Sequence, residues 1–275
     1  MECPYDVIQE SSARFDLGMF TYSIANGDTL RIQTKHRVTR IPTERNGFAG
    51  KEGFSNNQRV FQFLIAGHVR AHISTDQANV TPIENYAVEY DGGAGGINAG
   101  WDRAVFIPGL KLDLDWHVLD AFMSKETLSF SLDSDKVSVV PWAYPVATTQ
   151  MLTCLGTGVN DNGGTWPMLG QKQWFKFWLN GELQRNLVPA LNPSGTPCLF
   201  DFVSKTPFYN AGSGSFIAGI DNQAQLDNMI RKLPNRTGQA AGTLTVRLAD
   251  ELQTQENLAK LDAMSAKNWT ITQAA

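Results

Sequence analysis

Residues 174–219 read WFKFWLNGELQRNLVPALNPSGTPCLFDFVSKTPFYNAGSGSFIAG and contain the strongest strand and turn signals of the chain. The first six residues place Trp174, Lys176 and Trp178 on one side of an alternating pattern, with apolar residues between them. Because such a run is apolar enough on both sides to be enclosed in a sheet, it predicts a central strand.

Asn180-Gly181 comes directly after this run and predicts a hairpin turn, since both residues tolerate positive φ. The returning strand is expected over residues 183–188. Prolines then predict a loop over residues 189–197, and glycines after Asn210 predict a turn before a last strand over residues 215–218.

Short apolar or alternating runs separated by turn-rich segments continue the same pattern back toward the start of the chain. Aromatic residues make up 10% of the 275 residues, there are 24 glycines, and only 18% of residues are charged, which suits an all-β protein better than a helical one. The sequence therefore predicts a β-sandwich or jelly roll. The runs lie at residues 29–33, 60–65, 69–73, 87–90, 104–107, 128–132 and 136–140.

The stretch over residues 174–219 resembles the closing strands of laminin-G-like, or concanavalin A-like, jelly-roll domains of bacteriophage structural proteins. In these domains a polar turn precedes a strand that ends in a proline. Weaker similarity lies at residues 5–18 and 116–135, so the resemblance covers about residues 5–219. It implies a mainly β jelly-roll sandwich over residues 1–220. The residues that carry it are Asn180, Gly181, Glu182, Leu183, Arg185, Val188, Pro189, Leu199, Phe200, Asp201, Val203, Phe208, Tyr209, Asn210, Ala211, Gly212, Gly214, Phe216 and Gly219.

Residues 221–275 predict a separate, small α/β unit. Two helices are expected, over residues 225–233 and from Asp250 as a cap to residue 267, each followed by a strand. A strand, a crossover helix and a second strand normally pair parallel. The unit resembles the leucine-rich-repeat-like tails of phage and bacterial surface proteins. Because it is too small to bury a core alone, we expect it to dock on the sandwich or on another subunit.

Charge and cysteine content restrict the class of partner. The net charge of −4 argues against nucleic acid or an anionic membrane as the main partner, although Lys35, Arg37 and Arg40 could form a local basic patch. The three cysteines are too few and too oddly spaced for a disulfide framework or a zinc site. With no apolar run near 18 residues, neither a transmembrane helix nor a secretory signal is expected.

No catalytic motif is predicted. The serines near Gly212 belong to a β turn and not to a strand-to-helix elbow. Asp113 and Asp115 have the alternate spacing of a glycosidase carboxylate pair but lack a nearby glutamate partner. His68 and His72 would lie about 13 Å apart on a strand, too far to share one metal ion. We therefore expect a protein that is not an enzyme.

Two loops are candidates for ligand binding, although plain turns would use the same residue types. Clustered oxygen ligands in the loop over residues 160–164 could hold calcium, and the tryptophan that follows could stack on a sugar ring. A glycine-rich loop over residues 91–101 also ends in a tryptophan. The candidate ligand-binding residues are Trp101, Asp161, Asn162 and Trp166, the candidate calcium ligands are Asn160, Asp161 and Asn162, and no other cofactor is expected.

The resemblance implies a phage virion protein, a fibre, decoration or receptor-binding component on the particle exterior, made in the host cytoplasm. We expect loops at the rim of the sandwich to attach to a host surface polysaccharide while the sandwich faces pack as core. Other virion subunits and further copies of the chain are the expected partners, without nucleic acid or membrane insertion. The alternative is a structural adaptor or cement protein that binds virion subunits and no sugar. A cell-surface adhesin is disfavoured because no secretory signal is recognised, and a glycoside hydrolase is disfavoured because no catalytic carboxylate pair is recognised.

Overall fold

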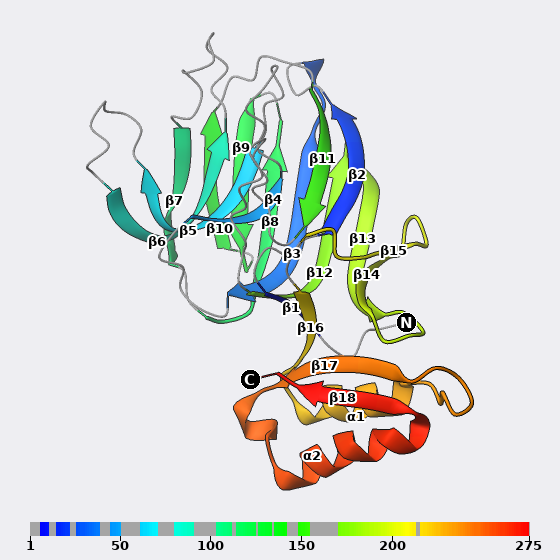
Figure 1. Cartoon of the computed structure of the whole chain (residues 1–275). Coiled ribbons are helices and arrows are strands. Elements are labelled where there is room, and N and C mark those ends of the chain that lie inside the picture. The colour runs from blue at the N-terminus through cyan, green and yellow to red at the C-terminus, as the bar shows by residue number, and fades with distance from the viewer. Residues whose placement is uncertain are drawn as a thin grey trace.

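The computed structural model shows two stacked β-sheets and a small α/β extension at one end of them (Figure 1). It describes residues 6–10, 15–22, 26–38, 45–50, 61–70, 80–90, 103–111, 114–124, 126–133, 135–141, 148–154, 170–212 and 215–274. Neither α1 nor any other helix within these ranges has the length and apolar character that a membrane span requires.

The longer sheet has twelve strands and runs from the sandwich into the extension. Its order is β10-β9-β8-β3-β12-β1-β16-β17-β18. One edge of β12 pairs with two strands: β1 pairs with its beginning and β13 with its end. From β13 the sheet continues to β14 and β15. The strands of its sandwich part are β1 (Asp6–Glu10), β3 (Leu30–Val38), β8 (His117–Met123), β9 (Thr127–Leu132), β10 (Asp135–Pro141), β12 (Gly170–Leu179), β13 (Glu182–Leu191), β14 (Pro197–Asp201), β15 (Pro207–Phe208) and β16 (Ser215–Ile220).

The shorter sheet has six strands in the order β2-β11-β4-β5-β6-β7, all paired antiparallel. One strand, β5, covers parts of two runs that the sequence analysis treats as separate. The strands are β2 (Phe15–Tyr22), β4 (Arg45–Gly50), β5 (Phe61–Arg70), β6 (Val80–Tyr90), β7 (Arg103–Lys111) and β11 (Thr148–Cys154).

The core between the sheets is apolar and tightly packed where β2 covers β12 and β13. Phe177 on β12 meets Phe20 on β2 edge to face, with ring centroids 4.9 Å apart. Phe15 at the start of β2 stacks on Phe216 of β16 at 4.1 Å. These contacts join the two sheets by burial of large aromatic rings. The buried apolar side chains of this region include Phe15, Leu17, Tyr22, Leu30, Ile32, Leu119, Ala121, Phe175, Phe177 and Leu187.

The hairpin predicted at Asn180-Gly181 is confirmed. Both residues have positive φ, at 53° and 78°, and Leu179 pairs with Glu182 across the turn. The loop predicted over residues 189–197 is present but shorter, over residues 192–196, because β13 continues to Leu191 and β14 begins at Pro197. Pro189 is tolerated in β13 because the pairing of β13 with β12 ends at Leu187. At Pro189 the strand pairs only with β14, so the β12 side of the strand needs no backbone N–H there.

The extension contains two strands, β17 and β18, which continue the longer sheet in parallel from β16, and two crossover helices on one side of them (Figure 1). The parallel pairing of its two strands is as the sequence predicts. Asp250 does not cap the second helix; the segment is broken into three pieces, and Thr254 caps the middle one by accepting a hydrogen bond from the Asn257 backbone N–H. The elements are α1 (Gln223–Lys232), β17 (Gly242–Leu248), η2 (Asp250–Leu252), α2 (Gln255–Asp262), η3 (Ala263–Lys267) and β18 (Trp269–Gln273).

The core of the extension is shared with the sandwich. Ala218 and Ile220 of β16 lie in the same buried cluster as residues of both helices and both extension strands, and Leu191 of β13 packs against it. A unit too small to bury a core alone therefore completes one with a strand of the sandwich. The domain boundary predicted at residue 220 stays a prediction. Ile220 pairs with Leu248, so the longer sheet passes through this point.

Candidate functional site

The candidate residues predicted from the sequence lie outside the described part of the chain. This applies to both proposed loops, so a calcium site and a sugar site there stay predictions. Within the described residues, no group of three His, Cys, Asp or Glu side chains is placed to hold a metal ion. The undescribed candidates are Trp101, Asn160, Asp161, Asn162 and Trp166, and Asp113 and His72 also fall outside the described residues.

Aromatic and cationic side chains lie together on the outer face of the longer sheet. On β3, Leu30 and Ile32 point inward and are buried, so the residues between them point outward. The β12 strand does the same with Phe175 and Phe177. We call the resulting surface the tryptophan–cation face. It consists of Arg31, Lys35 and Arg37 on β3, Trp174, Lys176 and Trp178 on β12, and Trp116 directly before β8.

Strand register places cations over the rings of β12. Arg31 is the cross-strand partner of Trp178, and its guanidinium carbon lies 5.3 Å from the ring centroid. Lys176 follows Trp174 by two residues on the same strand, and its Nζ lies 5.2 Å from that ring. Both distances are within the range of a cation–π attraction, which holds each ring and cation in a fixed relation.

The third tryptophan lies between two cations of β3. The Lys35 Nζ lies 5.9 Å from the Trp116 ring centroid and the Arg37 guanidinium carbon lies 5.1 Å from it. All three tryptophans are half-buried, so one side of each ring system is supported and part of it remains accessible to solvent. A supported, accessible ring is the form in which an aromatic side chain can bind a ligand with an apolar surface.

Asp120 of β8 fixes one arginine of the face. It accepts hydrogen bonds from Arg31 Nε at 2.9 Å, Arg31 Nη2 at 2.5 Å and Gln33 Nε2 at 2.7 Å. Burial alone would raise the pKa of Asp120, but the hydrogen bonds from Arg31 and Gln33 and the charge of Arg31 lower it overall. The hydrogen bond to Asp120 in turn raises the pKa of Arg31. Two parallel bonds to one carboxylate orient the guanidinium plane.

A second carboxylate fixes Arg37 where the sandwich meets the extension. Arg37 Nη2 donates to Asp221 Oδ1 at 2.7 Å, and its Nε donates to Gln171 Oε1. Asp221 lies between β16 and α1. Among the described residues, Lys35 and Lys176 have no comparable carboxylate partner, so their ammonium groups are the uncompensated charges of the face.

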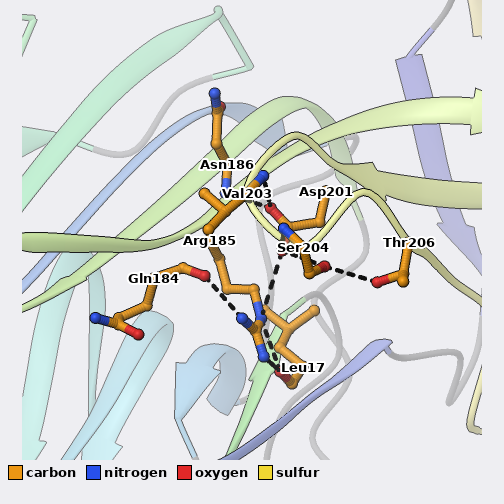
Figure 2. A network of polar contacts seen from close by, with 8 residues as sticks. All are labelled: Leu17, Gln184, Arg185, Asn186, Asp201, Val203, Ser204 and Thr206. Carbon is orange, nitrogen blue, oxygen red and sulfur yellow. Dashed lines mark hydrogen bonds and ion pairs between the residues drawn. The ribbon is translucent and has the colours of Figure 1, made fainter.

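A separate polar network connects the two sheets and is structural. The fully buried Asp201 accepts hydrogen bonds from the backbone N–H groups of Asn186 at 2.8 Å, Val203 at 3.0 Å and Ser204 at 3.2 Å, and from Ser204 Oγ at 2.8 Å (Figure 2). Arg185 Nε lies 3.8 Å from Asp201 Oδ2, and the guanidinium donates to the carbonyl oxygen of Leu17 on β2.

Arg185 in this network is enclosed by rings. Its guanidinium carbon lies 4.9 Å from the Phe20 ring centroid and 5.4 Å from that of Phe208. Burial lowers the pKa of Arg185, and the charge of Asp201 offsets part of that effect. Since the hydrogen-bonding groups of Asp201 and Arg185 are engaged within the protein, the network stabilises the fold and offers no ligand site.

The sequence pattern indicated parts of the tryptophan–cation face but not that they form one surface. It placed Trp174, Lys176 and Trp178 on one side of a strand and Lys35 and Arg37 in a basic patch; Arg40 lies outside the described residues. The expectation that the sandwich faces pack as core is wrong for this face. The signal that could have located it is the alternation of β3, in which Arg31, Lys35 and Arg37 all fall on the side opposite to Leu30 and Ile32.

Comparison with known proteins supports the fold. No protein-family description and no curated protein matches the sequence. A Bacteroides ovatus protein, provisionally assigned as carbohydrate binding, matches with a TM-score of 0.51 and 10% identity over 79% of this chain and 60% of that one. The match thus spans less than two thirds of that protein. Mouse laminin α1 domains LG4-5 match at 0.42 and 14% identity over 64% and 42% of the two chains. The Ruminococcus gnavus IT-sialidase CBM40 matches at 0.40 and 8% over 64% and 92%.

These identities establish similarity of fold alone, and the fold class rests on the described strands and on the first of the three structures. The chain is a mainly β protein with a jelly-roll β-sandwich and a small α/β extension.

Proposed function

We propose that this chain is a glycan-binding module whose ligand lies on the tryptophan–cation face. The observation that carries the proposal is the placement of three half-buried tryptophans, each beside a cation, on one outer face of a sheet. The provisional carbohydrate-binding assignment of the Bacteroides ovatus protein of the same fold supports it. Fold alone does not define a ligand, so the proposal depends on the side chains.

The face has the chemistry that a sugar chain requires. Indole rings pack against the C–H groups of a pyranose ring, while arginine, lysine, glutamine and carboxylate groups exchange hydrogen bonds with its hydroxyls. Trp174 and Trp178 are four residues apart on β12, which separates their Cα atoms by about 13 Å. The surface therefore suits several consecutive sugars better than a single one.

The biological setting that we propose is a bacteriophage virion, where the chain serves as a fibre, decoration or receptor-binding component that attaches to a host surface polysaccharide. The resemblance of residues 174–219 to phage structural domains supports this setting. Other virion subunits and further copies of the chain would be its partners. Several copies on one particle would raise the effective affinity for a repeating polysaccharide without further contacts. The extension would correspond to the leucine-rich-repeat-like tails of such proteins.

The first test is a glycan array with the purified chain, with and without calcium, beside the Trp178→Ala variant. We expect specific binding that the variant loses. Tyr209→Ala is the matched control, because Tyr209 is 42% exposed and lies after β15, away from the face. Circular dichroism checks that each variant is folded.

The result also separates this proposal from its alternatives. If Trp166→Ala abolishes binding and Trp178→Ala does not, the ligand lies at the loop predicted from the sequence. If the chain binds no glycan but associates with virion subunits, it is the adaptor or cement protein considered above, and the proposal is wrong.

A further inference from the structure

We infer that the tryptophan–cation face selects acidic glycans, namely polysaccharides whose sugars carry carboxylate groups. The inference rests on the proposed function, because it names the class of ligand for the same face. It is based on charges and contacts that neutral sugar binding does not require.

The first step is the balance of charge on the face. Four cations lie there, Arg31, Lys35, Arg37 and Lys176, against the two carboxylates that contact them, Asp120 and Asp221. The face therefore carries a net charge of +2, from four minus two, on a chain whose net charge is −4. A positively charged surface on an otherwise acidic protein attracts anionic ligands to that surface.

The second step is the difference among the four cations in their pairing with carboxylates. Asp120 and Asp221 orient Arg31 and Arg37, so these arginines support the rings and their charges are already compensated. Lys35 and Lys176 have no such partner among the described residues and remain able to bind an incoming anion. A lysine acts on a carboxylate as a mobile point charge with three donors.

The third step is the position of the two lysines. Lys35 pairs with Trp174 across the β3–β12 ladder, and Lys176 pairs with Gln33, so the lysines are diagonal neighbours whose Cα atoms lie about 7–8 Å apart. The Lys176 Nζ lies 5.2 Å from the Trp174 ring centroid, and the Lys35 Nζ lies 5.9 Å from the Trp116 ring centroid. Each ammonium group therefore lies beside a different ring, where it could contact the carboxylate of a sugar that packs on that ring.

Single-stranded nucleic acid uses the same residue types, since bases stack on aromatic rings and phosphates meet cations. Such proteins neutralise many phosphates along a strand. A face with a net charge of +2 on an acidic chain offers little for a polyanion with one charge per nucleotide. We therefore favour a glycan, because its sugar rings carry hydroxyl groups and it can have fewer charges per unit than a nucleic acid.

The experiment measures binding of the full chain to polysaccharides in which uronic acids alternate with neutral sugars, beside the same polymers after reduction of their carboxyl groups to alcohols. We expect binding to the acidic polymer that is at least about tenfold tighter than to its reduced counterpart, and that weakens as salt is raised. The double variant Lys35→Gln, Lys176→Gln should lose the preference, so that it binds the acidic and the reduced polymer with about equal affinity. Trp174→Ala should weaken binding to both.

Four outcomes decide the matter. Preference for the acidic polymer that depends on the lysines supports the inference. Equal binding to acidic and reduced polymers overturns the inference and leaves the proposed function standing. Binding to neither, on these polymers and across a broad array, overturns both. Tighter binding to oligodeoxythymidine than to any acidic glycan overturns the inference in favour of nucleic acid.

Discussion

Replacement of Asp201 by alanine should be among the most destabilising single changes in the described part of the chain. Asp201 is fully buried and accepts four hydrogen bonds, three of them from backbone N–H groups. Breaking a buried charged network by removing one member costs about 3–5 kcal/mol, because the remaining groups stay buried and unpaired. We expect a loss of that size in the free energy of unfolding.

Urea unfolding followed by tryptophan fluorescence measures this loss by linear extrapolation. Asp201→Asn should lie between wild type and alanine, since its carbonyl oxygen can still accept the bonds from Asn186 and Val203, which both go to Oδ1. Ser204→Ala removes a single hydroxyl donor from the same carboxylate and should cost only about 1 kcal/mol. If Asp201→Ala costs no more than Ser204→Ala, the network does not stabilise the fold in the way described.

Three further predictions concern other parts of the structure. Gly195→Ala should lower the free energy of unfolding by at least about 2 kcal/mol, because φ is +93° and the new Cβ would collide with the Thr243 carbonyl oxygen. Gly181→Ala is the control: Gly181 also has positive φ but has open space around it, so this change should cost about half as much in the same urea titration. Burial, followed by the charges of Lys172 and His117, holds the pKa of His36 well below its ordinary value, so the folded protein keeps His36 neutral while the unfolded chain takes up a proton below about pH 6.5. This contribution to stability is fully present above pH 6.5 and falls by up to about 1.4 kcal/mol per pH unit below it, and His36→Gln should reduce that slope in unfolding measured from pH 7.5 to 5.5; an unchanged slope would contradict it. Asn222→Ala should cost about 1 kcal/mol of thermal stability, since its side chain accepts a hydrogen bond from the Gln225 N–H at the start of α1; a shift within error in calorimetry would show that the cap is dispensable.

Local signals in the sequence were sufficient for some elements. The Asn180-Gly181 hairpin depends on two adjacent residues that accept positive φ, and it formed where expected. The parallel pairing of β17 and β18 follows from the handedness of crossover connections. Both rules act over short distances or on simple connectivity, so one sequence is enough to apply them.

Non-local pairing was beyond the same reasoning. The strand β14 exists because residues 197–201 pair with the far end of β13, and nothing near Pro197 indicates that partner. The candidate site was missed for a related reason. Trp174 and Trp178 alternate with Phe175 and Phe177, and both sets are aromatic, so the strand alone does not show which side faces solvent. Only its pairing with β3, whose arginines and lysines face outward, settles the question.

The passage of the longer sheet through β16 has a mechanical consequence. A force applied to the extension reaches the sandwich through β16, whose residues 215–219 pair with β1 on one side and whose residues 218–220 pair with β17 on the other. Because these strands lie side by side, a pull along them loads the hydrogen bonds of a ladder together, whereas a flexible linker would transmit only tension through a single chain. The extension and the sandwich are therefore connected by a hydrogen-bonded sheet as well as by the chain itself.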